Sequence, residues 1–338
     1  MTEPLKIGVL GAGSWGTALA YLVGSAGHRV TLWAFEAEVA ASINAAHKNP
    51  LYLSEAVLPE TVTAAQDPGA AVVGQDLVLF VIPAQLARTY LRAVASLLPA
   101  HTPIVICSKG IERKTLATMH QVFVAELPVP VARNLAVLSG PSFATEVALG
   151  MPTNVTVAAL DLDVARRVQS AIATRAFRIY TSDDVTGVEL GGALKNVIAI
   201  AIGAADGLGF GHNTRAGIIT RGLSEITRLA VSMGARPETL LGLAGVGDLI
   251  LTCSSDLSRN RQVGKLLAQG HSLANVQKQM RMIAEGVPTA ESAYQLALRQ
   301  GVELPITEQV YRVLYEGQSV PAAMAALQDR SLKEEWQS

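Results

Sequence analysis

The chain has 338 residues, of which 50% are apolar and 16% are charged, and its formal net charge is −1. This length accommodates two domains at roughly 100–200 residues each, and the composition predicts a large buried core rather than disorder. A net charge near zero, without a long run of like charge, excludes the usual electrostatic signature of a nucleic-acid-binding or membrane-surface protein.

Short apolar runs and longer amphipathic stretches alternate over the first half of the chain. The expected strands are Lys6–Leu10, Arg29–Trp33, Leu77–Ile82, Ile104–Cys107, Leu135–Leu138, Asn154–Ala158 and Phe177–Tyr180. The expected helices between them include Gly13–Ala26, Ala84–Leu97 and Asp161–Ala173. Continuous apolar strands are typical of parallel strands buried on both faces. The alternation therefore predicts an α/β domain with a doubly wound sheet over residues 1–182.

The second half of the chain changes character after Tyr180, where the strand-like runs end. The expected helices are Val185–Ala205, Arg215–Met233, Arg259–Ala268, Leu273–Met280, Thr289–Arg299 and Ile306–Leu314. Glycine or proline separates them. We expect an all-α domain over residues 183–338, with the boundary near Thr181–Asp184.

Several features favour a cytoplasmic protein without a membrane span. Residues Met1–Lys6 lack the basic-then-apolar layout of a signal peptide. The longest continuous apolar run, Val197–Ala205, is too short to cross a bilayer. Cys107 and Cys253 lie far apart in the sequence, which makes a disulfide framework implausible and fits a reducing compartment.

A glycine-rich turn, Gly11-Ala-Gly13-Ser-Trp-Gly16, follows the first strand and opens the first helix. The tight turn requires Gly11, Gly13 lets the backbone approach a pyrophosphate, and Gly16 lets the helix pack on the sheet. Free backbone N–H groups at the helix N-terminus then face the phosphates. Because this spacing is common in ordinary turns, its position between a strand and a helix is what favours dinucleotide binding.

The second strand ends in Trp33-Ala-Phe35-Glu36, and Glu36 lies twenty residues after Gly16. That is the spacing expected for a carboxylate that binds the ribose hydroxyls of the cofactor. No Arg or Lys follows the strand to bind a 2′-phosphate, so NAD is favoured over NADP. Phe35 is expected to lie against the adenine. The alternative is that Phe35 and Glu36 only begin a helix.

Lys195 lies in a helix that is apolar on nearly every face, which predicts that the helix is buried. Gly191 and Gly192 precede Lys195 on the same helical face and leave room for a ligand beside it. Burial should lower the pKa of the lysine from about 10.4 towards neutrality, which suits a proton carrier. The alternative is a lysine that reaches the surface or pairs with a carboxylate.

Polar groups that could meet a substrate lie in four further segments. Asp248 follows a glycine-rich turn and is expected to orient Lys195, to cap a helix, or to do both. The segment Ser258–Arg261 combines two cations with two hydrogen-bonding side chains, as a phosphate dianion requires, or it is a helix start capped by Ser258. Lys109 and Ser142 follow strand ends, where ligands bind in open α/β sheets, and Ser142 is a possible helix cap.

The six histidines show no metal-ligand spacing, so we expect no metal site. His212 lies in a glycine-containing turn and is expected to have a local role only.

Seven segments together resemble the NAD(P)-dependent glycerol-3-phosphate dehydrogenases of the bacterial type. They are Gly11–Ala18, Ser108–Gly110, Ser139–Ala144, Gly191–Asn196, Ala244–Leu249, Ser258–Arg261 and Ala284–Gly286. They occur in the order that the family shows and span nearly the whole chain. The resemblance implies an N-terminal Rossmann domain, an all-α C-terminal domain and a homodimer.

The resemblance also implies an activity and the residues that carry it. The enzyme would transfer a hydride between NAD(P)(H) and C2 of sn-glycerol 3-phosphate or dihydroxyacetone phosphate, and so supply glycerol 3-phosphate for phospholipid synthesis. Lys195 would be the proton donor and acceptor, with Asp248 as its catalytic partner. The implied substrate contacts are Lys109, Gly140, Ser142, Lys195, Asp248, Ser258, Arg259 and Asn260. The implied cofactor contacts, with the glycine turn included, are Gly11, Gly13, Ser14, Trp15, Gly16, Phe35, Tyr52, Lys109, Ala144, Arg259, Ile283 and Glu285.

One segment departs from the bacterial pattern. Bacterial members often carry Arg or His where Phe35 stands, and Trp33–Glu36 is more similar to the eukaryotic cytosolic branch, which prefers NAD. We therefore expect NAD or NADP as cofactor, with NAD favoured by Phe35 and Glu36.

Two other functions fit parts of the sequence. A lysine-based dehydrogenase of hydroxy acids or sugar acids would explain the glycine turn and Lys195, but it explains Ser258–Arg261 only if that segment binds a carboxylate. A binding module that senses nicotinamide without catalysis is the other alternative, and Lys195 beside two glycines argues against it.

Overall fold

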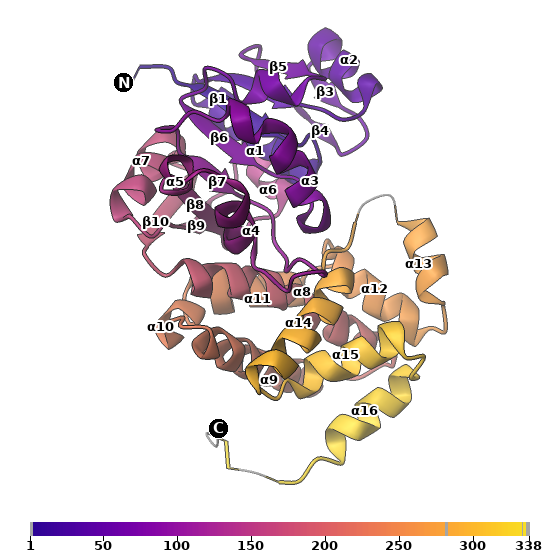
Figure 1. The fold of residues 1–338 in the computed structure, drawn as a ribbon. Coiled ribbons are helices and arrows are strands. Elements are labelled where there is room, and N and C mark those ends of the chain that lie inside the picture. Colours follow the sequence, from indigo (N-terminus) through magenta and orange to yellow (C-terminus); the bar gives the residue numbers. More distant parts are fainter. Residues whose placement is uncertain (1–2, 281–282, 333, 336–338) are drawn as a thin grey trace. The chain divides into compact units, whose positions relative to one another are not determined.

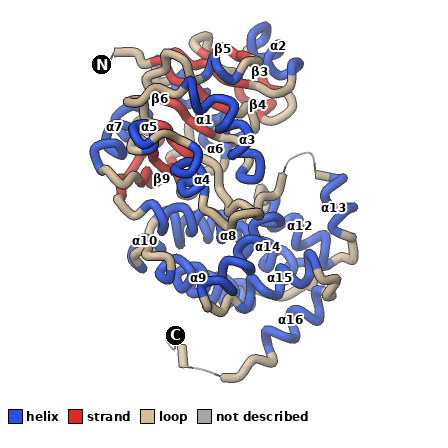
Figure 2. The backbone as a smooth tube through the Cα atoms, viewed as in Figure 1, coloured by secondary structure: helices blue, strands red, loops and turns tan. Residues whose placement is uncertain are grey.

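The computed structural model describes residues 3–280, 283–332 and 334–335, and these form two compact units. The first unit contains the described residues up to Ser108 together with Met119–Val185, and the second contains Lys109–Thr118 and the described residues from Thr186 onwards. Figure 2 shows the main sheet in the first unit, whereas the second unit is built from helices.

The first unit contains an eight-stranded sheet and a two-stranded hairpin (Figure 1). The strands are β1 Lys6–Leu10, β2 Arg29–Trp33, β3 Lys48–Asn49, β4 Leu53–Val57, β5 Val62–Ala65, β6 Leu77–Phe80, β7 Ile104–Ile106, β8 Leu135–Ser139, β9 Thr153–Ala158 and β10 Phe177–Ser182. The helices are α1 Ser14–Ser25, α2 Ala37–Ala46, α3 Ala84–Val94, α4 Met119–Glu126, α5 Val129–Ala132, α6 Ala144–Ala148 and α7 Leu162–Ile172, with 3₁₀ turns at Pro68–Ala71 and Ala95–Leu97.

The strand order in the large sheet is β10-β9-β8-β7-β6-β1-β2-β5. The chain extends the sheet to one side of β1 through β2 and β5, and then crosses to the other side through β6. The order therefore reverses beside β1, and such a switch point is where open α/β sheets bind their ligands. The Rossmann-type sheet that the sequence predicted is confirmed.

Alternate residues of the central strands face two different layers of helices. Leu77 and Leu79 of β6 belong to the same buried cluster as residues of α1, α6 and α7. Phe80 points to the opposite face and packs edge-on against Phe123 of α4, with ring centroids 4.8 Å apart. Both faces of the sheet are thus covered, which explains why its strands are continuous apolar runs.

The expectation of parallel strands is wrong for one pair. β8 and β9 are antiparallel, whereas the six other strand pairs of this sheet are parallel. A parallel connection usually crosses back over the sheet through a helix that spans the length of the strand, and five helical residues span only about 7.5 Å. The connection from β8 to β9 contains only the five-residue helix α6, so the chain returns in the opposite direction.

The helices of the second unit include the expected ones, and several differ in their bounds. They are α8 Val185–Gly207, α9 His212–Ser232, α10 Pro237–Leu240, α11 Asp248–Ser254, α12 Arg259–Ala268, α13 Leu273–Gln279, α14 Gly286–Gln300, α15 Pro305–Tyr315 and α16 Val320–Gln328, with a π-helical turn at Leu243–Gly247. Neither the short helices α10 and α11 nor α16 was expected, because segments this short carry little periodicity.

The segment 109–118 packs with the second unit, although the sequence placed it in the first domain. Ser292 of α14 donates a hydrogen bond of 3.0 Å to the carbonyl of Ile111, and Arg113 pairs with Glu291. Arg299 of α14 donates to the carbonyl of Thr115 at 3.3 Å. These bonds hold the segment along α14 and bring Lys109 into the second unit.

Helix α8 is long and apolar enough to cross a membrane by length and composition, although its continuous apolar run is short. However, 94% of the residues in its most apolar 18-residue window are buried inside the structure. That burial is typical of the core helix of a globular unit. Two glycines make its contact with α12 close, since a Cβ atom at Gly203 would lie 1.8 Å from the carbonyl oxygen of Arg261, and one at Gly264 would lie 1.9 Å from that of Ile200.

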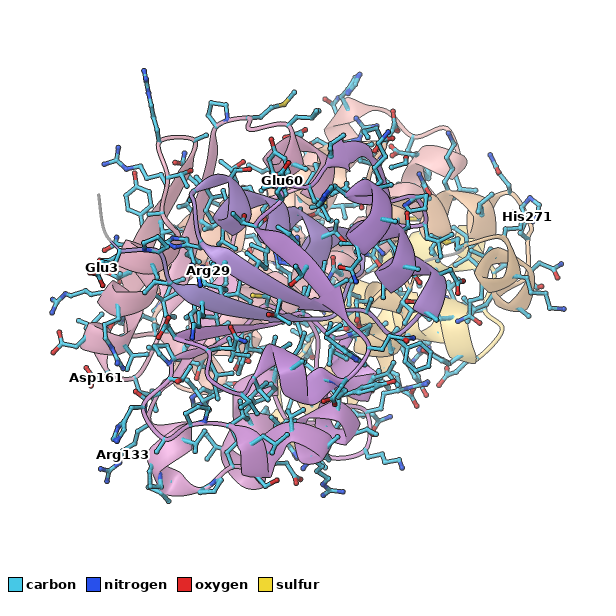
Figure 3. The ribbon with its side chains drawn as sticks, turned by 90° about the horizontal axis from the view of Figure 1, so that it is seen from above. Glu3, Arg29, Glu60, Arg133, Asp161 and His271 are labelled. Atoms are coloured by element: carbon cyan, nitrogen blue, oxygen red, sulfur yellow. The ribbon has the colours of Figure 1, made fainter. Side chains whose placement is uncertain are left out.

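Charged side chains of both signs are exposed on the first unit, and over the whole chain the 27 basic and 28 acidic residues nearly balance. Figure 3 labels Glu3, Glu60 and Asp161 among the acidic residues and Arg29 and Arg133 among the basic ones. All five are exposed.

Glu225 of α9 is a buried carboxyl group that caps another helix. It accepts hydrogen bonds from the backbone N–H of Ile306 and from both the N–H and the hydroxyl of Thr307, the latter two at 3.1 Å. Ile306 and Thr307 lie in the first turn of α15, where N–H groups lack helical partners. Burial raises the pKa of Glu225 to about 7, against the opposing effect of these bonds and of the Arg228 charge.

Glu225→Gln is expected to remove a pH-dependent part of the stability. Between pH 4.5 and 7 the unfolded chain releases this proton while the folded chain retains it, so the contribution to stability is present below pH 4.5 and is lost as pH rises through 7. The wild-type free energy of unfolding should fall by roughly 3 kcal/mol more than that of the variant. Urea unfolding at pH 5 and pH 8 measures this, with Glu316→Gln at the half-exposed end of α15 as control. An equal pH dependence in both proteins would contradict the assignment.

Candidate active site

The glycine-rich turn at the switch point has the geometry that a dinucleotide requires. Gly11 has φ +113°, which a side chain would disfavour. A Cβ atom at Gly16 would lie 1.8 Å from the carbonyl oxygen of Gly11, so helix α1 can begin this close to the turn only with glycine there. No atom lies within 4 Å of a Cβ placed at Gly13, so the backbone is open to a ligand. The turn and the N-terminus of α1, with Ser14 and Trp15, therefore fit a pyrophosphate.

Phe35 and Glu36 follow β2 at the same edge of the sheet. Phe35 is 69% exposed and stands edge-on to Trp33, with ring centroids 6.5 Å apart. Glu36 directly precedes α2, as the alternative interpretation expected, but its side chain makes no capping hydrogen bond. Instead its Oε1 accepts a bond of 2.6 Å from the hydroxyl of Tyr52. The Glu36 carboxylate is thus held beside the glycine turn and is not used to cap the helix.

The hairpin of β3 and β4 connects Tyr52 to the glycine turn. Asn49 is fully buried, and its Nδ2 donates to the carbonyl of Ala12 and to Thr17 Oγ1, both at 2.8 Å. Ser14 Oγ donates to the carbonyl of Tyr52 at 2.7 Å. These contacts fix the hairpin on the turn. So short a hairpin shows no periodic pattern in the sequence, and Asn49 was not expected to take part.

The loop after β8 contains two of the expected ligand contacts of the first unit, Gly140 and Ser142, and a third, Ala144, begins helix α6. Gly140 has φ +142°, and a Cβ there would lie 2.9 Å from Val155 Cα. Ser142 Oγ donates to the carbonyl of Gly140 at 3.0 Å. The expectation that Ser142 caps a helix is wrong, because α6 begins at Ala144 and Phe143 occupies the capping position. Ser142 instead stabilises the turn that precedes the helix.

In the second unit, Lys195, Lys109 and Asp248 share one buried ion-pair cluster. Lys195 Nζ donates to Asp248 Oδ1 and, at 2.9 Å, to Thr252 Oγ1. Lys109 Nζ donates to Asp248 Oδ2 at 2.6 Å. Lys195 is 7% exposed and Asp248 is fully buried. The pairing of Lys195 with a carboxylate, which was considered as an alternative to catalysis, is therefore present. It does not exclude a catalytic role, because Lys195 and Lys109 share the single carboxylate of Asp248.

Burial lowers the pKa of Lys195 to about 7. The negative charge of Asp248 opposes this shift, and the positive charge of Lys109 adds to it. At neutral pH both forms of the amine are therefore populated, as proton transfer requires. With both lysines charged the cluster carries one net positive charge, so it favours an anionic ligand.

Close backbone packing brings Asp248 to Lys195. A Cβ at Gly191 of α8 would lie 2.5 Å from the carbonyl oxygen of Ala244, in the π-helical turn that precedes Asp248. The expectation that Gly191 leaves room for a ligand is thus corrected, since this glycine makes room for the protein's own backbone. Asp248 does not cap α11, because Gly247 holds the capping position and the Asp248 oxygens bind the two lysines.

Some side chains of the segment Ser258–Arg261 bond to the protein itself, and others could contact a ligand. Ser258 caps α12, as its Oγ accepts from the N–H of Arg261 at 3.3 Å. Arg261 is not part of a phosphate fork, because its guanidinium pairs with Asp206 at 2.6 Å and also with Asp256. Arg259 is exposed, and its Nη1 donates to the carbonyl of Ile283 at 3.1 Å. The first turn of α12 thus presents one arginine rather than two.

Asn260 is buried in an amide network that joins α8, α12 and α14. Its Nδ2 donates to Asn196 Oδ1, and its Oδ1 accepts from the N–H of Gly286, both at 2.9 Å. Asn196 directly follows Lys195, so this network fixes the first turn of α12 relative to the lysine. Glu285 precedes α14 at the same place.

Sequence reasoning missed Thr252 and Asn196. Thr252 lies four residues after Asp248 in α11, and this spacing places both side chains on one helical face. That spacing was a usable signal. Asn196 could not be identified in this way, because its partner Asn260 lies 64 residues later. Among the described residues no group of three His, Cys, Asp or Glu side chains is placed to hold a metal ion, and Cys107 and Cys253 are buried and are not joined in a disulfide.

Comparisons with known proteins cover nearly the whole chain. The model of the NAD-dependent glycerol-3-phosphate dehydrogenase N-terminus matches residues 6–165, and that of its C-terminus matches residues 184–325. The chain is 55% identical to the NAD(P)+-dependent glycerol-3-phosphate dehydrogenase of Geobacter sulfurreducens over 330 residues, which are 98% of both chains.

Two solved structures are similar over their full length. The crystal structure of glycerol-3-phosphate dehydrogenase from Coxiella burnetii has a TM-score of 0.92 and 38% identity, and the match covers 97% of this chain and 99% of that one. The glycerol-3-phosphate dehydrogenase of Saccharomyces cerevisiae has a TM-score of 0.78 and 28% identity, with 97% and 100% of the chains covered.

Proposed function

The chain belongs to the NAD-dependent glycerol-3-phosphate dehydrogenase family, and on this premise we propose that Lys195 exchanges the proton of the reaction while Asp248 orients it. The enzyme transfers a hydride between NAD(P)(H) and C2 of glycerol 3-phosphate or dihydroxyacetone phosphate. The observation that carries the proposal is the buried Lys195 amine, which is held between Asp248 and Thr252.

The chemistry assigns a role to each protonation state of Lys195. The bound nicotinamide supplies or accepts the hydride. For reduction, the Lys195 ammonium polarises the C2 carbonyl and then protonates the alkoxide oxygen. For oxidation, the neutral amine accepts the proton of the C2 hydroxyl. Asp248 keeps Nζ in one orientation, and Lys109 adds a fixed positive charge beside the developing oxyanion.

The substrate phosphate is assigned to the first turn of α12. Arg259, an exposed residue whose guanidinium is partly buried, provides a cation there, and the Asn260 amide has a second hydrogen beside the one that it donates to Asn196. Ser258 lies at the start of the same helix, whose N-terminus favours an anion. Binding the phosphate remote from C2 orients the reacting carbon, which can supply several kcal/mol towards the rate. Lys109, Gly140 and Ser142 complete the proposed substrate contacts.

The cofactor is assigned to the glycine turn and the residues around it. Gly11, Gly13 and Gly16 provide the open turn described above, and Glu36 is held at the end of β2. We assign NAD as the preferred cofactor, since Glu36 is acidic and Phe35 stands where bacterial relatives often carry a cation. The other proposed contacts are Ser14, Trp15, Tyr52, Lys109, Ala144, Arg259, Ile283 and Glu285.

The alternative functions are set aside by the family assignment. A sensing module without catalysis and a dehydrogenase of hydroxy acids both disagree with full-length identity to enzymes that act on glycerol 3-phosphate. The family's substrate is a phosphorylated triose, which agrees with the single available arginine on α12.

We further assign the enzyme to the cytoplasm, where it supplies glycerol 3-phosphate for phospholipid synthesis. Cys107 and Cys253 are buried and form no disulfide, which supports a reducing compartment. We retain residues 1–182 and 183–338 as the two functional domains, with segment 109–118 added to the second. We also propose a homodimer, as the sequence resemblance implies, and sedimentation velocity tests it.

The pH dependence of the two reaction directions tests the role of Lys195. Because the pKa of its amine is about 7, the rate of reduction should fall as pH rises through 7, and the rate of oxidation should rise over the same range. Each limb should approach a tenfold change per pH unit away from the midpoint. Initial rates between pH 5.5 and 9, followed by the absorbance of the reduced nicotinamide, measure both limbs. Parallel limbs in the two directions would contradict the assignment.

A further inference from the structure

The Tyr52 side chain is fixed before any ligand binds. Its N–H donates to Asn49 Oδ1 at 3.3 Å, and its carbonyl accepts from Ser14 Oγ. Asn49 is itself fully buried against the glycine turn. Both ends of the Tyr52 backbone are therefore tied to the segment that binds the pyrophosphate, so the hydroxyl has little freedom to move relative to it.

The Tyr52 hydroxyl is directed at Glu36 rather than at solvent. It donates to Glu36 Oε1 at 2.6 Å, a distance typical of a bond to an ionised carboxylate. This bond, more than burial, raises the pKa of Tyr52 to about 12. The hydroxyl therefore remains a donor at all physiological pH values. The Glu38 carboxylate also acts on Tyr52, so a second negative charge lies close by.

We propose that Tyr52 is a positioning residue that selects NAD over NADP by holding the Glu36 carboxylate at the adenosine ribose site. This inference rests on the proposed cofactor site. It adds Tyr52 as a residue that affects cofactor specificity through Glu36. With Oε1 bound to Tyr52, Oε2 of Glu36 is free to accept the ribose hydroxyls. A 2′-phosphate would instead face a carboxylate that cannot rotate away into water.

The physical basis is the difference between a fixed and a mobile charge. A mobile glutamate lowers its repulsion of a phosphate by turning into solvent, where charges are strongly screened. A fixed glutamate keeps the repulsion and also loses no side-chain entropy when it binds the ribose. Fixing Glu36 therefore strengthens NAD binding and weakens NADP binding. Both effects raise the ratio of the NAD affinity to the NADP affinity.

Direct binding to the cofactor-free protein tests the inference without any turnover. Isothermal titration calorimetry gives the Kd of NAD+ and of NADP+ for the wild type, Tyr52→Phe, Glu36→Ala and the double variant. Tyr52→Phe keeps the ring and removes only the hydroxyl. We expect it to weaken NAD+ binding about fivefold to tenfold, to leave NADP+ binding unchanged or tighter, and so to lower the preference for NAD+ about tenfold.

The double variant separates positioning from direct contact. If Tyr52 acts through Glu36, Tyr52→Phe should change the Kd of NAD+ less than twofold in the Glu36→Ala background. Equal effects in both backgrounds would show that the hydroxyl contributes to NAD+ binding independently of Glu36 and would overturn the inference. An unchanged ratio of the two Kd values in Tyr52→Phe would also overturn it, as would a wild type that prefers NADP+.

The control is Tyr180→Phe, on β10 at the opposite edge of the sheet from β5, where the ring is 48% exposed. This variant loses the same atom and should bind both dinucleotides as the wild type does. A wild type that binds neither dinucleotide would refute the proposed cofactor site itself, and so the two failures are distinguishable.

Discussion

Replacing Lys195 with alanine is expected to lower kcat about 10³-fold and to change dinucleotide affinity less than twofold. In the proposed mechanism this amine exchanges the proton, and burial lowers its pKa to about 7. The glycine turn and Glu36 lie in the first unit, so the dinucleotide contacts proposed there do not depend on the lysine. Asp248 keeps Lys109 as a partner, which protects the fold.

Two further variants test whether the loss of turnover reflects the loss of proton transfer. Lys195→Arg keeps a positive charge but not an exchangeable proton near neutral pH, so it should be as inactive as the alanine variant. Lys265→Ala removes an exposed lysine from α12 and should keep full turnover. Stopped-flow turnover and calorimetric dinucleotide binding provide the two measurements. Near-normal turnover in Lys195→Ala would refute the proton-transfer role.

The sequence predicted the elements of the fold better than their directions. β1, β2 and α12 have the bounds that their apolar pattern predicted. The antiparallel return of β9 was not predicted, because a strand buried on both faces has the same apolar pattern in either direction. Its direction depends on the short helix α6, and five residues carry no clear helical period.

For the candidate site, the sequence predicted the burial of a single unusual residue, but it did not predict contacts between residues that lie far apart in the chain. Lys195 was identified because a lysine in an apolar helix is unusual. The partner of Arg261 was not, since Asp206 lies 55 residues away and no local pattern connects them. Because that partner was not recognised, the segment Ser258–Arg261 was interpreted as a phosphate site with two cations. Gly191 was misinterpreted for the same reason, because Ala244 fills the space beside it.

Asp248→Asn is expected to reduce both activity and stability. The substitution keeps the size of the side chain and removes the only negative charge that Lys195 and Lys109 are seen to share in the described structure. The buried ammonium of Lys195 and the partly buried one of Lys109 would then face a neutral amide, so the pKa of Lys195 should fall below 7. Breaking a buried ion pair in this way typically costs 3–5 kcal/mol, and we expect a loss of about 3 kcal/mol in the free energy of unfolding.

The kinetic effect of Asp248→Asn follows from the same shift and has a distinctive pH dependence. At pH 7 most of the lysine would be neutral, so reduction should slow about 10²-fold, and its pH midpoint should move to lower pH. Lowering the pH should therefore restore part of the reduction rate in the variant. Asp256→Asn is the matched control, because Asp256 is 97% exposed and its pairing with Arg261 contributes at most about 1 kcal/mol. If the midpoint of Asp248→Asn stayed near pH 7, the carboxylate would not set the protonation of Lys195, and its role would be limited to packing.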